Sequence, residues 1–425
     1  MEGIYLKRIC DQLLREKLEA KGAVLVKGAK WCGKTTTSAA IARSAIYIED
    51  PARKKQYLEM AEIDPVTLLR GDVPRLIDEW QLAPKLWDAV RFEVDKRDDF
   101  GQFILTGSAV PPDTSEISHT GIGRITSLLM RPMTLFESGD SDGSVSLRAL
   151  FSKEHEISGT CDHSINDIVF FICRGGWPKG IGRSRKIALA QAPDYYDGLV
   201  ESDISRVDDV ERDPERARRV MRAYARSVSS EATVASLLRD VRTDDNDTFS
   251  ENTLRSYLSA FRKLFVIEDT PAWNPNLRSK TAIRSSDTRY FVDPSIAAAA
   301  LGIGPNDLIN DLSTAGLFFE NMAVRDLRVY AESIGGSVYH YRDKSDLECD
   351  AVVHLKNGKY GLVEIKLGGD KLIEEGAANL LKLHERIDCE KMNEPAFMMV
   401  LCGVAPFAYK RSDGVMVVPI GCLRN

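Results

Sequence analysis

The residues best suited to chemistry follow the apolar run 24–26, where Gly28 and Gly33 enclose four residues and Lys34 and Thr35 come next. This spacing is typical of a phosphate-binding loop, in which backbone N–H groups and the lysine neutralise phosphate charge and the hydroxyl ligates Mg²⁺. A helix is expected to begin near Lys34 and to point its positive end at the phosphates. A glycine-rich turn without a ligand is the competing interpretation. The predicted nucleotide-binding residues are Gly28, Ala29, Lys30, Trp31, Cys32, Gly33, Lys34, Thr35 and Thr36.

Two carboxylates, Asp78 and Glu79, end a short apolar strand that includes Leu76 and Ile77. A strand-end aspartate holds Mg²⁺ through water, and the next residue points to the other face, where a glutamate polarises the attacking water. Adjacent carboxylates also occur in solvated turns. The phosphate-binding loop earlier in the chain favours the catalytic interpretation.

A third strand is predicted at residues 102–105, with Thr106 and Ser108 at its end. Polar residues at the end of a neighbouring parallel strand are well placed to position water or a γ-phosphate. They equally suit the capping of a strand end, and the sequence favours neither interpretation.

Together these segments resemble the AAA-type ATPases of bacteria and archaea that carry a C-terminal restriction-endonuclease-like domain of unknown function. The resemblance covers nearly the whole chain and rests, in the first half, on GAKWCGKTTTS, LIDEWQLAP, FILTGSA and RPMTLFE. It implies Mg²⁺-dependent binding and hydrolysis of ATP. It also implies that Arg124 is an arginine finger or sensor, which supplies positive charge to the transition state in cis or from a neighbouring molecule. A surface or helix-capping arginine fits the position equally well.

The turn from Gly175 to Pro178 resembles the glycine-proline turn that packs near the adenine in related signalling ATPases. Pro178 is therefore predicted to contribute to nucleotide binding. A rigid turn that separates two helices is the alternative.

The composition is that of a globular protein of two to four domains, with 425 residues, 44% hydrophobic and 28% charged residues. The net charge of −6 gives no overall argument for nucleic-acid binding. Eight cysteines without paired spacing indicate neither a zinc site nor a disulfide framework. With no secretory leader and no apolar run long enough to span a bilayer, a soluble cytoplasmic protein without membrane contact is expected.

The middle of the chain reads as helices within residues 214–240 and 250–264, followed by two extended segments, FVIEDT and RYFVDP. Two or three helices with a two-stranded wing outline a winged helix-turn-helix, which the resemblance also implies. Between Glu251 and Arg289 there are seven Lys or Arg and four Asp or Glu, a modest excess of three for a DNA reader. A lever or docking module is the alternative. The candidate phosphate contacts are Arg255, Arg262, Lys263, Arg278, Lys280 and Arg284.

The last 110 residues or so look like the PD-(D/E)XK nuclease fold, through Glu320 on a helix, Asp350, and Glu364 and Lys366 on a later strand. Asp350 and Glu364 would hold Mg²⁺. Lys366 shares their strand face because strand side chains alternate with period two. There it would orient the attacking water or stabilise the negative charge of the transition state. The same pattern also occurs on solvated sheet edges.

The predicted fold class is α/β, with a P-loop ATPase core at 1–155, a helical lid at 156–205, a winged-helix connector at 206–300 and an α/β restriction-endonuclease-like domain at 301–425. ATP hydrolysis would change how the connector presents the last domain to a nucleic acid. In one alternative the chain is a nucleotide-operated switch that acts on a protein partner. In another it is a nucleotide-binding scaffold with negligible turnover. Nuclease activity and the oligomeric state stay open.

Overall fold

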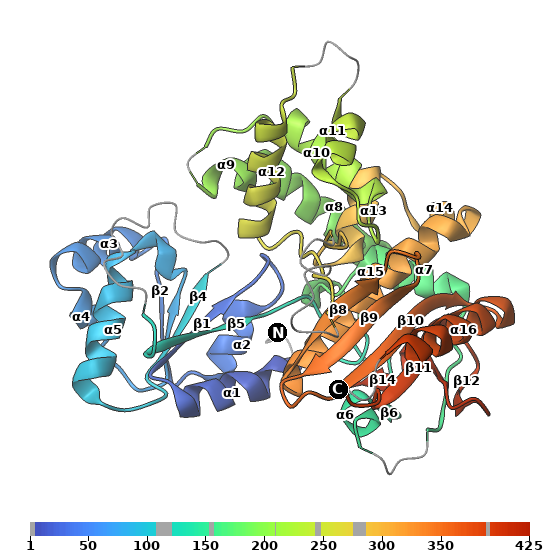
Figure 1. The fold of residues 1–425 in the computed structure, drawn as a ribbon. Helices are drawn as coiled ribbons and strands as arrows, with labels where there is room; N and C mark the ends of the chain where they lie inside the picture. The colour runs from blue at the N-terminus through green and yellow to red at the C-terminus, as the bar shows by residue number, and fades with distance from the viewer. Residues whose placement is uncertain are drawn as a thin grey trace. The chain divides into compact units, whose positions relative to one another are not determined.

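The computed structural model describes residues 5–107, 121–152, 157–208, 210–242, 248–274, 286–387 and 392–425. The chain divides into two compact units (Figure 1). The first comprises Met1–Pro132, Glu201–Asp213 and Ser259–Phe265, and the second comprises Met133–Val200, Pro214–Leu258 and Val266–Asn425. The four domain boundaries expected from the sequence stay a prediction.

The first unit is built on a parallel sheet of five strands in the order β2-β3-β4-β1-β5. In the central strand Ala23 lies opposite Phe103 of one neighbour and Ile125 of the other, so the strands end at a common edge. The strands are β1 (Ala23–Lys27), β2 (Ser44–Tyr47), β3 (Arg75–Asp78), β4 (Phe103–Gly107) and β5 (Ile125–Leu129). The α/β class with a parallel sheet is confirmed.

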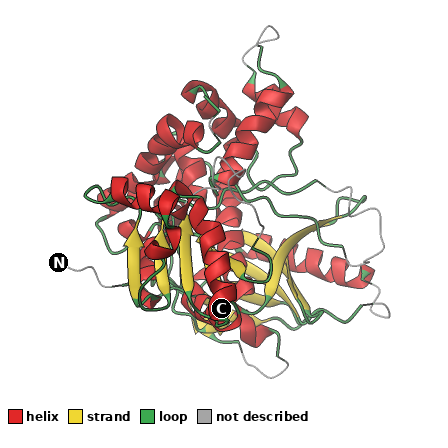
Figure 2. Ribbon diagram, turned by 90° about the vertical axis from the view of Figure 1, so that its left-hand side faces the viewer, coloured by secondary structure: helices red, strands yellow, loops and turns green. Residues whose placement is uncertain are grey.

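Both faces of this sheet are covered, as a parallel sheet requires (Figure 2). Alternating residues of β1 divide between two cores: Ala23 packs with Leu86 and Val90 of one helix, and Val24 packs with Leu14 and Leu18 of another. The helices of this unit are α1 (Cys10–Ala20), α2 (Lys34–Ile41), α3 (Lys54–Ile63), α4 (Pro65–Leu68), α5 (Lys85–Arg97) and α9 (Ile204–Arg206), with a 3₁₀ turn at Trp80–Leu82.

The second unit contains a mixed sheet in the order β7-β12-β13-β11-β10-β9-β8. Strands β8, β9 and β10 form an antiparallel meander, and β11 then lies parallel to β10 after a helical crossover. The strands are β7 (Gly159–Thr160), β8 (Gly336–Arg342), β9 (Glu348–Leu355), β10 (Tyr360–Gly368), β11 (Phe397–Val404), β12 (Phe407–Lys410) and β13 (Met416–Pro419). A separate pair joins β6 (Val145–Ser146) to β14 (Leu423–Arg424).

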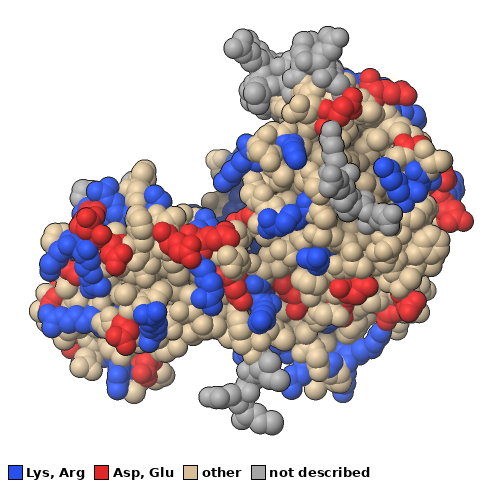
Figure 3. All heavy atoms as spheres, turned by 90° about the horizontal axis from the view of Figure 1, so that it is seen from below, with Lys and Arg blue, Asp and Glu red and all other residues tan. Residues whose placement is uncertain are grey.

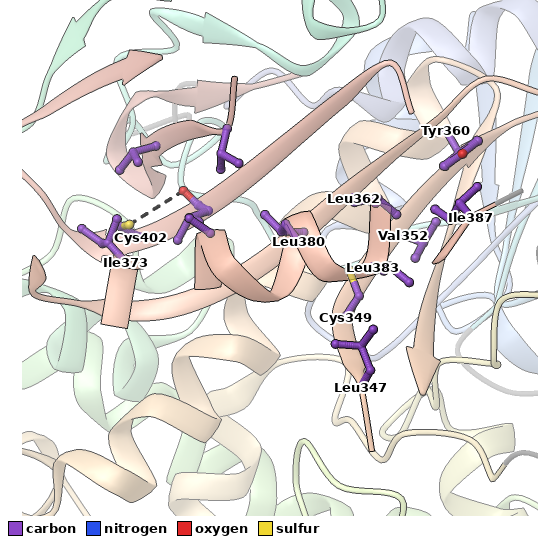
Figure 4. Close-up of a cluster of buried hydrophobic side chains, with 14 of the residues drawn as sticks. Leu347, Cys349, Val352, Tyr360, Leu362, Ile373, Leu380, Leu383, Ile387 and Cys402 are labelled. Carbon is purple, nitrogen blue, oxygen red and sulfur yellow. Dashed lines mark hydrogen bonds between the residues drawn. The ribbon is translucent and has the colours of Figure 1, made fainter. Parts of the chain in front are cut away.

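Helix α16 (Asp370–Arg386) is the crossover between β10 and β11, and its apolar face packs on that sheet (Figure 4). Ile373, Leu380 and Leu383 of the helix lie in one buried cluster with Leu362 and Val400 of the strands. The i, i+7, i+10 spacing of the helical residues places them on one side.

The other helices of the second unit include those predicted for the middle of the chain, and two isolated antiparallel bridges, Ile267–Phe291 and Thr270–Thr288, join the predicted extended pair. The winged-helix assignment itself stays a prediction. The helices are α6 (Leu147–Leu150), α7 (Ile165–Arg174), α8 (Arg185–Gly198), α10 (Pro214–Arg226), α11 (Val234–Val241), α12 (Glu251–Lys263), α13 (Pro294–Leu301), α14 (Pro305–Asn310) and α15 (Leu312–Ser333); the last turn of α12 is grouped with the first unit.

A buried charge network ties distant segments of the second unit together. Arg325 on α15 lies 2.7 Å from Asp293 and 2.7 Å from Asp326, with all three side chains almost fully buried. The two aspartates in turn accept backbone hydrogen bonds from Gly176 and Leu135. Because a buried charge is costly unless paired, these contacts fix the segments that meet there.

Acidic and basic side chains are interspersed on the face drawn in Figure 3. Among the helices of the described ranges, none is long and apolar enough to cross a membrane.

Candidate nucleotide site and a second carboxylate site

The predicted phosphate-binding loop runs from the end of β1 to the start of α2, which begins at Lys34 as expected. Gly28 has φ +152°, and a Cβ there would lie 2.1 Å from the carbonyl oxygen of Met130, so only glycine fits. Gly33 has φ +106° and Trp31 has φ +64°. The Lys34 ammonium donates to the carbonyl oxygens of Gly28 (3.0 Å) and Ala29 (2.9 Å), so the side chain turns back over its own loop.

The loop is joined to the neighbouring strand ends through one carboxylate oxygen. Asp78 Oδ1 accepts a hydrogen bond from the Thr35 hydroxyl at 2.7 Å and another from the Thr106 hydroxyl. The two predicted metal residues are therefore in direct contact. A hydroxyl and a carboxylate are the oxygen ligands that Mg²⁺ prefers, and Lys34 with the loop backbone suits phosphate, so the residues present fit both groups.

Glu79 follows the strand in a left-handed conformation, with φ +55°. Its carboxylate accepts a hydrogen bond from the Gln81 side-chain amide. Burial raises the pKa of Glu79, and the hydrogen bond from Gln81 and the charge of Lys34 offset this increase only in part. A carboxylate with a raised pKa is a stronger base once ionised, which suits the predicted role of accepting a proton.

The remaining loop residues have different surroundings. Lys30 lies 2.6 Å from Asp203, which comes from the separate segment Glu201–Asp213 of the same unit. Cys32 is buried, and its thiol donates to the carbonyl oxygen of Met130. Trp31 and Thr36 are exposed.

Arg124 lies at the opposite end of the sheet from the loop. Its carbonyl oxygen accepts from the N–H of Ala23, the first residue of β1, and its guanidinium lies 2.7 Å from Asp95 of α5. The structure thus does not bring Arg124 to Lys34 of the same chain, and its finger role stays a prediction. Ser108 lies outside the described residues.

Pro178 begins a 3₁₀ turn in the second unit. The turn is well anchored, because the indole N–H of Trp177 donates to Ser295 at 2.9 Å and the N–H of Gly176 donates to Asp293 at 2.9 Å. Its predicted contact with adenine stays a prediction.

The predicted nuclease residues gather at the β9–β10 pair of the second unit. Lys366 Nζ lies 2.6 Å from Glu364 Oε2 and 3.2 Å from Asp350 Oδ2, and Asp350 also accepts from the N–H of Ile365 at 2.7 Å. Glu320 on α15 accepts a hydrogen bond from the Tyr290 hydroxyl. The charges of Asp350 and Lys366 also act on Glu320, so the four predicted side chains form one electrostatic group.

The charges in this group perturb one another. Burial raises the pKa of Glu364 well above its ordinary value, the negative charge of Asp350 raises it further, and Lys366 offsets part of the shift. Burial alone would lower the pKa of Lys366, but the two carboxylates reverse the effect and raise it. Glu320 likewise has a raised pKa through burial and the charge of Asp350.

Glu364 is fully buried, and neither of its carboxylate oxygens has a hydrogen-bond donor in the described part of the chain. Its close contact with Lys366 at 2.6 Å is an ion pair. A buried carboxylate that lies beside a second carboxylate is the kind of group that a metal cation would stabilise. Across the described ranges, however, no three His, Cys, Asp or Glu residues are arranged to hold a metal ion.

Acidic residues lie beside described candidates for DNA contact. Arg255 lies 2.7 Å from Glu251, and Lys263 lies 3.1 Å from Asp208. Arg262 is exposed. The other three candidates, Arg278, Lys280 and Arg284, fall outside the described residues.

Sequence reasoning missed four contacts of these sites: those of Arg8 with the phosphate-binding loop, Asp203 with Lys30, Gln81 with Glu79 and Tyr290 with Glu320. Only the contact of Gln81 could have been expected from the sequence, because Gln81 lies two residues after Glu79. The other three come from remote parts of the chain.

Three segments of the chain match family models. Residues 20–138 match the model described as "AAA domain", residues 165–307 match "Domain of unknown function (DUF8612)", and residues 315–423 match "Domain of unknown function (DUF4143)". The AAA match covers the sheet, the loop and both strand-end carboxylates of the first site.

Similar whole proteins were also found. The uncharacterized proteins Rv2008c of Mycobacterium tuberculosis and Mb2031c of Mycobacterium bovis are each 25% identical over 363 residues, covering 83% of this chain and 72% of theirs. A Walker-type ATPase of Pyrococcus abyssi has 15% identity and a TM-score of 0.44, covering 70% of this chain and 96% of its own. The AAA match, on the segment that holds Lys34, Thr35 and Asp78, supports a P-loop ATPase of the AAA type.

Proposed function

We propose that the protein binds ATP with Mg²⁺ at the first site and hydrolyses it there. The observation that carries the proposal is the contact between Thr35 and Asp78, which joins the phosphate-binding loop to the strand end beside Glu79. In this proposal Thr35 supplies the metal-binding hydroxyl, Asp78 supports the metal and Glu79 is the base; the Thr35–Asp78 contact supports it.

Each side chain has a distinct role in this proposal. Lys34 leaves the carbonyl oxygens of Gly28 and Ala29 and binds phosphate oxygens, while the loop N–H groups bind the phosphates from the other side. Mg²⁺, when bound by Thr35 and supported by Asp78, would supply charge neutralisation to the phosphates. Glu79 accepts the proton of the attacking water, a task for which its raised pKa suits it.

The test is ATP turnover and nucleotide affinity of Glu79→Gln beside the wild type. The variant should keep its nucleotide affinity and lose hydrolysis by about 10²–10⁴-fold, because only the proton acceptor is removed. Glu59→Gln, which changes an exposed glutamate of α3, serves as the control and should leave both quantities unchanged. A trace rate that does not change in Glu79→Gln would instead support a scaffold without turnover.

Hydrolysis at this site is proposed to act on a nucleic acid through the connector and the C-terminal domain, and domain order supports this link. Stimulation of wild-type turnover by single- or double-stranded DNA is the expected result. A turnover rate indifferent to both DNA forms would favour the alternative, a nucleotide-operated switch for a protein partner, which the anchored turn at Trp177 and Pro178 also suits.

A second candidate activity is cleavage of a phosphodiester at the Glu364 site. The specific observation in its favour is the fully buried carboxylate of Glu364, which pairs with Lys366 and lies within reach of the negative charge of Asp350. Such a group costs stability, and costly arrangements of this kind are often retained for function. A bound cation would satisfy Glu364 and Asp350, and Lys366 would then be free to orient water.

Lys366→Ala should abolish Mg²⁺-dependent cleavage of DNA or RNA while ATP hydrolysis continues. Lys371→Ala, at an exposed lysine of α16, is the matched control and should leave cleavage intact. Circular dichroism of both variants separates loss of the site from loss of the fold. Cleavage that survives in a folded Lys366→Ala protein would remove this lysine from the mechanism.

A further inference from the structure

Arg8, a buried arginine that precedes the phosphate-binding loop in the sequence, contacts the backbone of that loop. The guanidinium of Arg8 donates one hydrogen bond to the carbonyl oxygen of Cys32 at 2.8 Å and another to that of Arg131, also at 2.8 Å. Arg8 itself is only 7% exposed. It therefore ties the loop to the segment that follows β5, and it precedes the residues that match the AAA domain.

The contact with Cys32 orients the peptide that leads into Gly33. In a planar trans peptide the C=O of one residue and the N–H of the next point in opposite directions. Because Arg8 draws the Cys32 carbonyl toward itself, the N–H of Gly33 points away from Arg8. Gly33 directly precedes the first residue of α2, where N–H groups form an anion site.

The segment that carries Arg8 is held in place by hydrogen bonds of Asp11 and Tyr5. Asp11 accepts hydrogen bonds from the N–H of Arg8 at 3.0 Å and from the Tyr5 hydroxyl at 2.6 Å. The Tyr5 oxygen lies 3.1 Å from the hydroxyl of Thr37, within α2. Residues 5–11 thus form a brace that contacts both the loop and the helix behind it.

We propose that Arg8 is a positioning residue for phosphate binding: it fixes the Cys32–Gly33 peptide so that the Gly33 N–H faces the bound phosphates. This inference rests on the proposed nucleotide site. Arginine is required because its planar fork reaches two carbonyl oxygens at once, whereas a lysine ammonium is a compact point charge on a flexible stem.

The test compares Arg8→Lys, Arg8→Met and the control Arg15→Met, an exposed arginine of α1, in the full chain. The readouts are the Kd for ADP, the Kd for adenosine and the thermal unfolding midpoint without nucleotide. We expect Arg8→Lys to weaken ADP binding by about tenfold or more while adenosine binding stays nearly unchanged; the lost hydrogen bond should also lower the unfolding midpoint, but by less than in Arg8→Met. Arg15→Met should match the wild type throughout.

The other outcomes overturn the inference. Unchanged ADP affinity in folded Arg8→Lys would show that the peptide needs no such brace. Equal weakening of ADP and adenosine binding would assign Arg8 to general packing. If Arg8→Met does not fold, the ADP and adenosine affinities of Arg8→Lys alone test the positioning role of Arg8. A wild type that binds no ADP would refute the proposed function itself, and this inference with it, whereas a wild type that binds ADP without hydrolysing ATP would refute only the turnover.

Discussion

The Thr35 hydroxyl donates a 2.7 Å hydrogen bond to Asp78, a residue 43 positions away in the sequence. The two oxygens lie within one hydrogen bond of each other because β1 and β3 both pair with β4 in parallel register, which places the end of β3 beside the loop that follows β1. A metal ion bound by Thr35 would therefore lie close to Asp78.

Removal of the Thr35 hydroxyl should abolish the effect of Mg²⁺ on nucleotide affinity. Thr35→Val keeps the shape of the side chain and removes only the ligand oxygen, so Mg²⁺-ATP binding should weaken by about 10–100-fold. Affinity measured with Mg²⁺ and with EDTA checks the prediction. Thr35→Ser, which keeps the hydroxyl, should respond to Mg²⁺ like the wild type; an equal response in Thr35→Val would exclude this residue as a ligand.

The acidic limb of the turnover profile should depend on Gln81. Glu79 accepts protons only when ionised, so turnover falls as the pH falls through its pKa, which burial has raised. The hydrogen bond from Gln81 lowers that pKa. Gln81→Leu removes the bond and should move the acidic limb to higher pH.

The test is the pH dependence of kcat for Gln81→Leu. Gln12→Leu, which changes an exposed residue of α1, is the control. The control should superimpose on the wild type. An acidic limb that stays in place after Gln81→Leu would mean that another group sets it.

Neutralising Glu364 should stabilise the protein when metal is absent. Its folded-state pKa is raised, so the unfolded chain loses this proton at lower pH than the folded chain does. The wild type therefore loses stability relative to Glu364→Gln as the pH rises above about 4.3, by up to about 1.4 kcal/mol per pH unit until the folded-state pKa is passed.

Urea unfolding in EDTA at several pH values measures the difference. Glu375→Gln changes a half-exposed glutamate of α16 and should alter the free energy of unfolding by less than about 0.5 kcal/mol at every pH. A Glu364→Gln protein that is less stable than the wild type at neutral pH would show that this carboxylate stabilises the metal-free fold.

The turn at Gly176 should not accept a side chain. A Cβ at this position would lie 2.1 Å from the Met133 carbonyl oxygen and 2.6 Å from its nitrogen, both backbone atoms that cannot rotate away. Gly176→Ala should therefore cost about 1–3 kcal/mol of stability. Gly198→Ala, at a glycine of α8 with no atom within 4 Å of the added Cβ, should be neutral or stabilise by up to about 1 kcal/mol. Similar unfolding midpoints for the two variants would contradict the close approach at Gly176.

The first site could be predicted from the sequence to the extent that its signals are local. Gly28, Gly33 and Lys34 lie within one short loop, so their spacing in the sequence is enough to identify them. Asp78 is recognisable because it ends an apolar strand. Contacts such as those of Arg8 and Asp203 arise only when remote segments pack, and a single arginine or aspartate in a sequence carries no sign of its partner.

The second site shows the same division. The alternation of Glu364 and Lys366 on one strand predicts that both lie on one face, and they do. The contact of Tyr290 with Glu320 depends on how the segment before α13 packs on α15, which no local pattern encodes. Arg124 illustrates the reverse case: its motif position suggests a finger role, whereas in this chain it lies at the end of the sheet opposite the phosphate-binding loop and contacts Asp95.

The pairing of β6 with β14 affects how the chain acquires its structure during synthesis. The Ser141 hydroxyl donates to the carbonyl oxygen of Leu423, 282 residues later. At translation rates of roughly 5–20 residues per second, the first partner emerges from the ribosome roughly 14–56 seconds before the second exists. Val145, which is buried in the finished fold, lacks its strand partner Leu423 over that interval. The β6–β14 pair is therefore among the last contacts of the second unit that can form during synthesis.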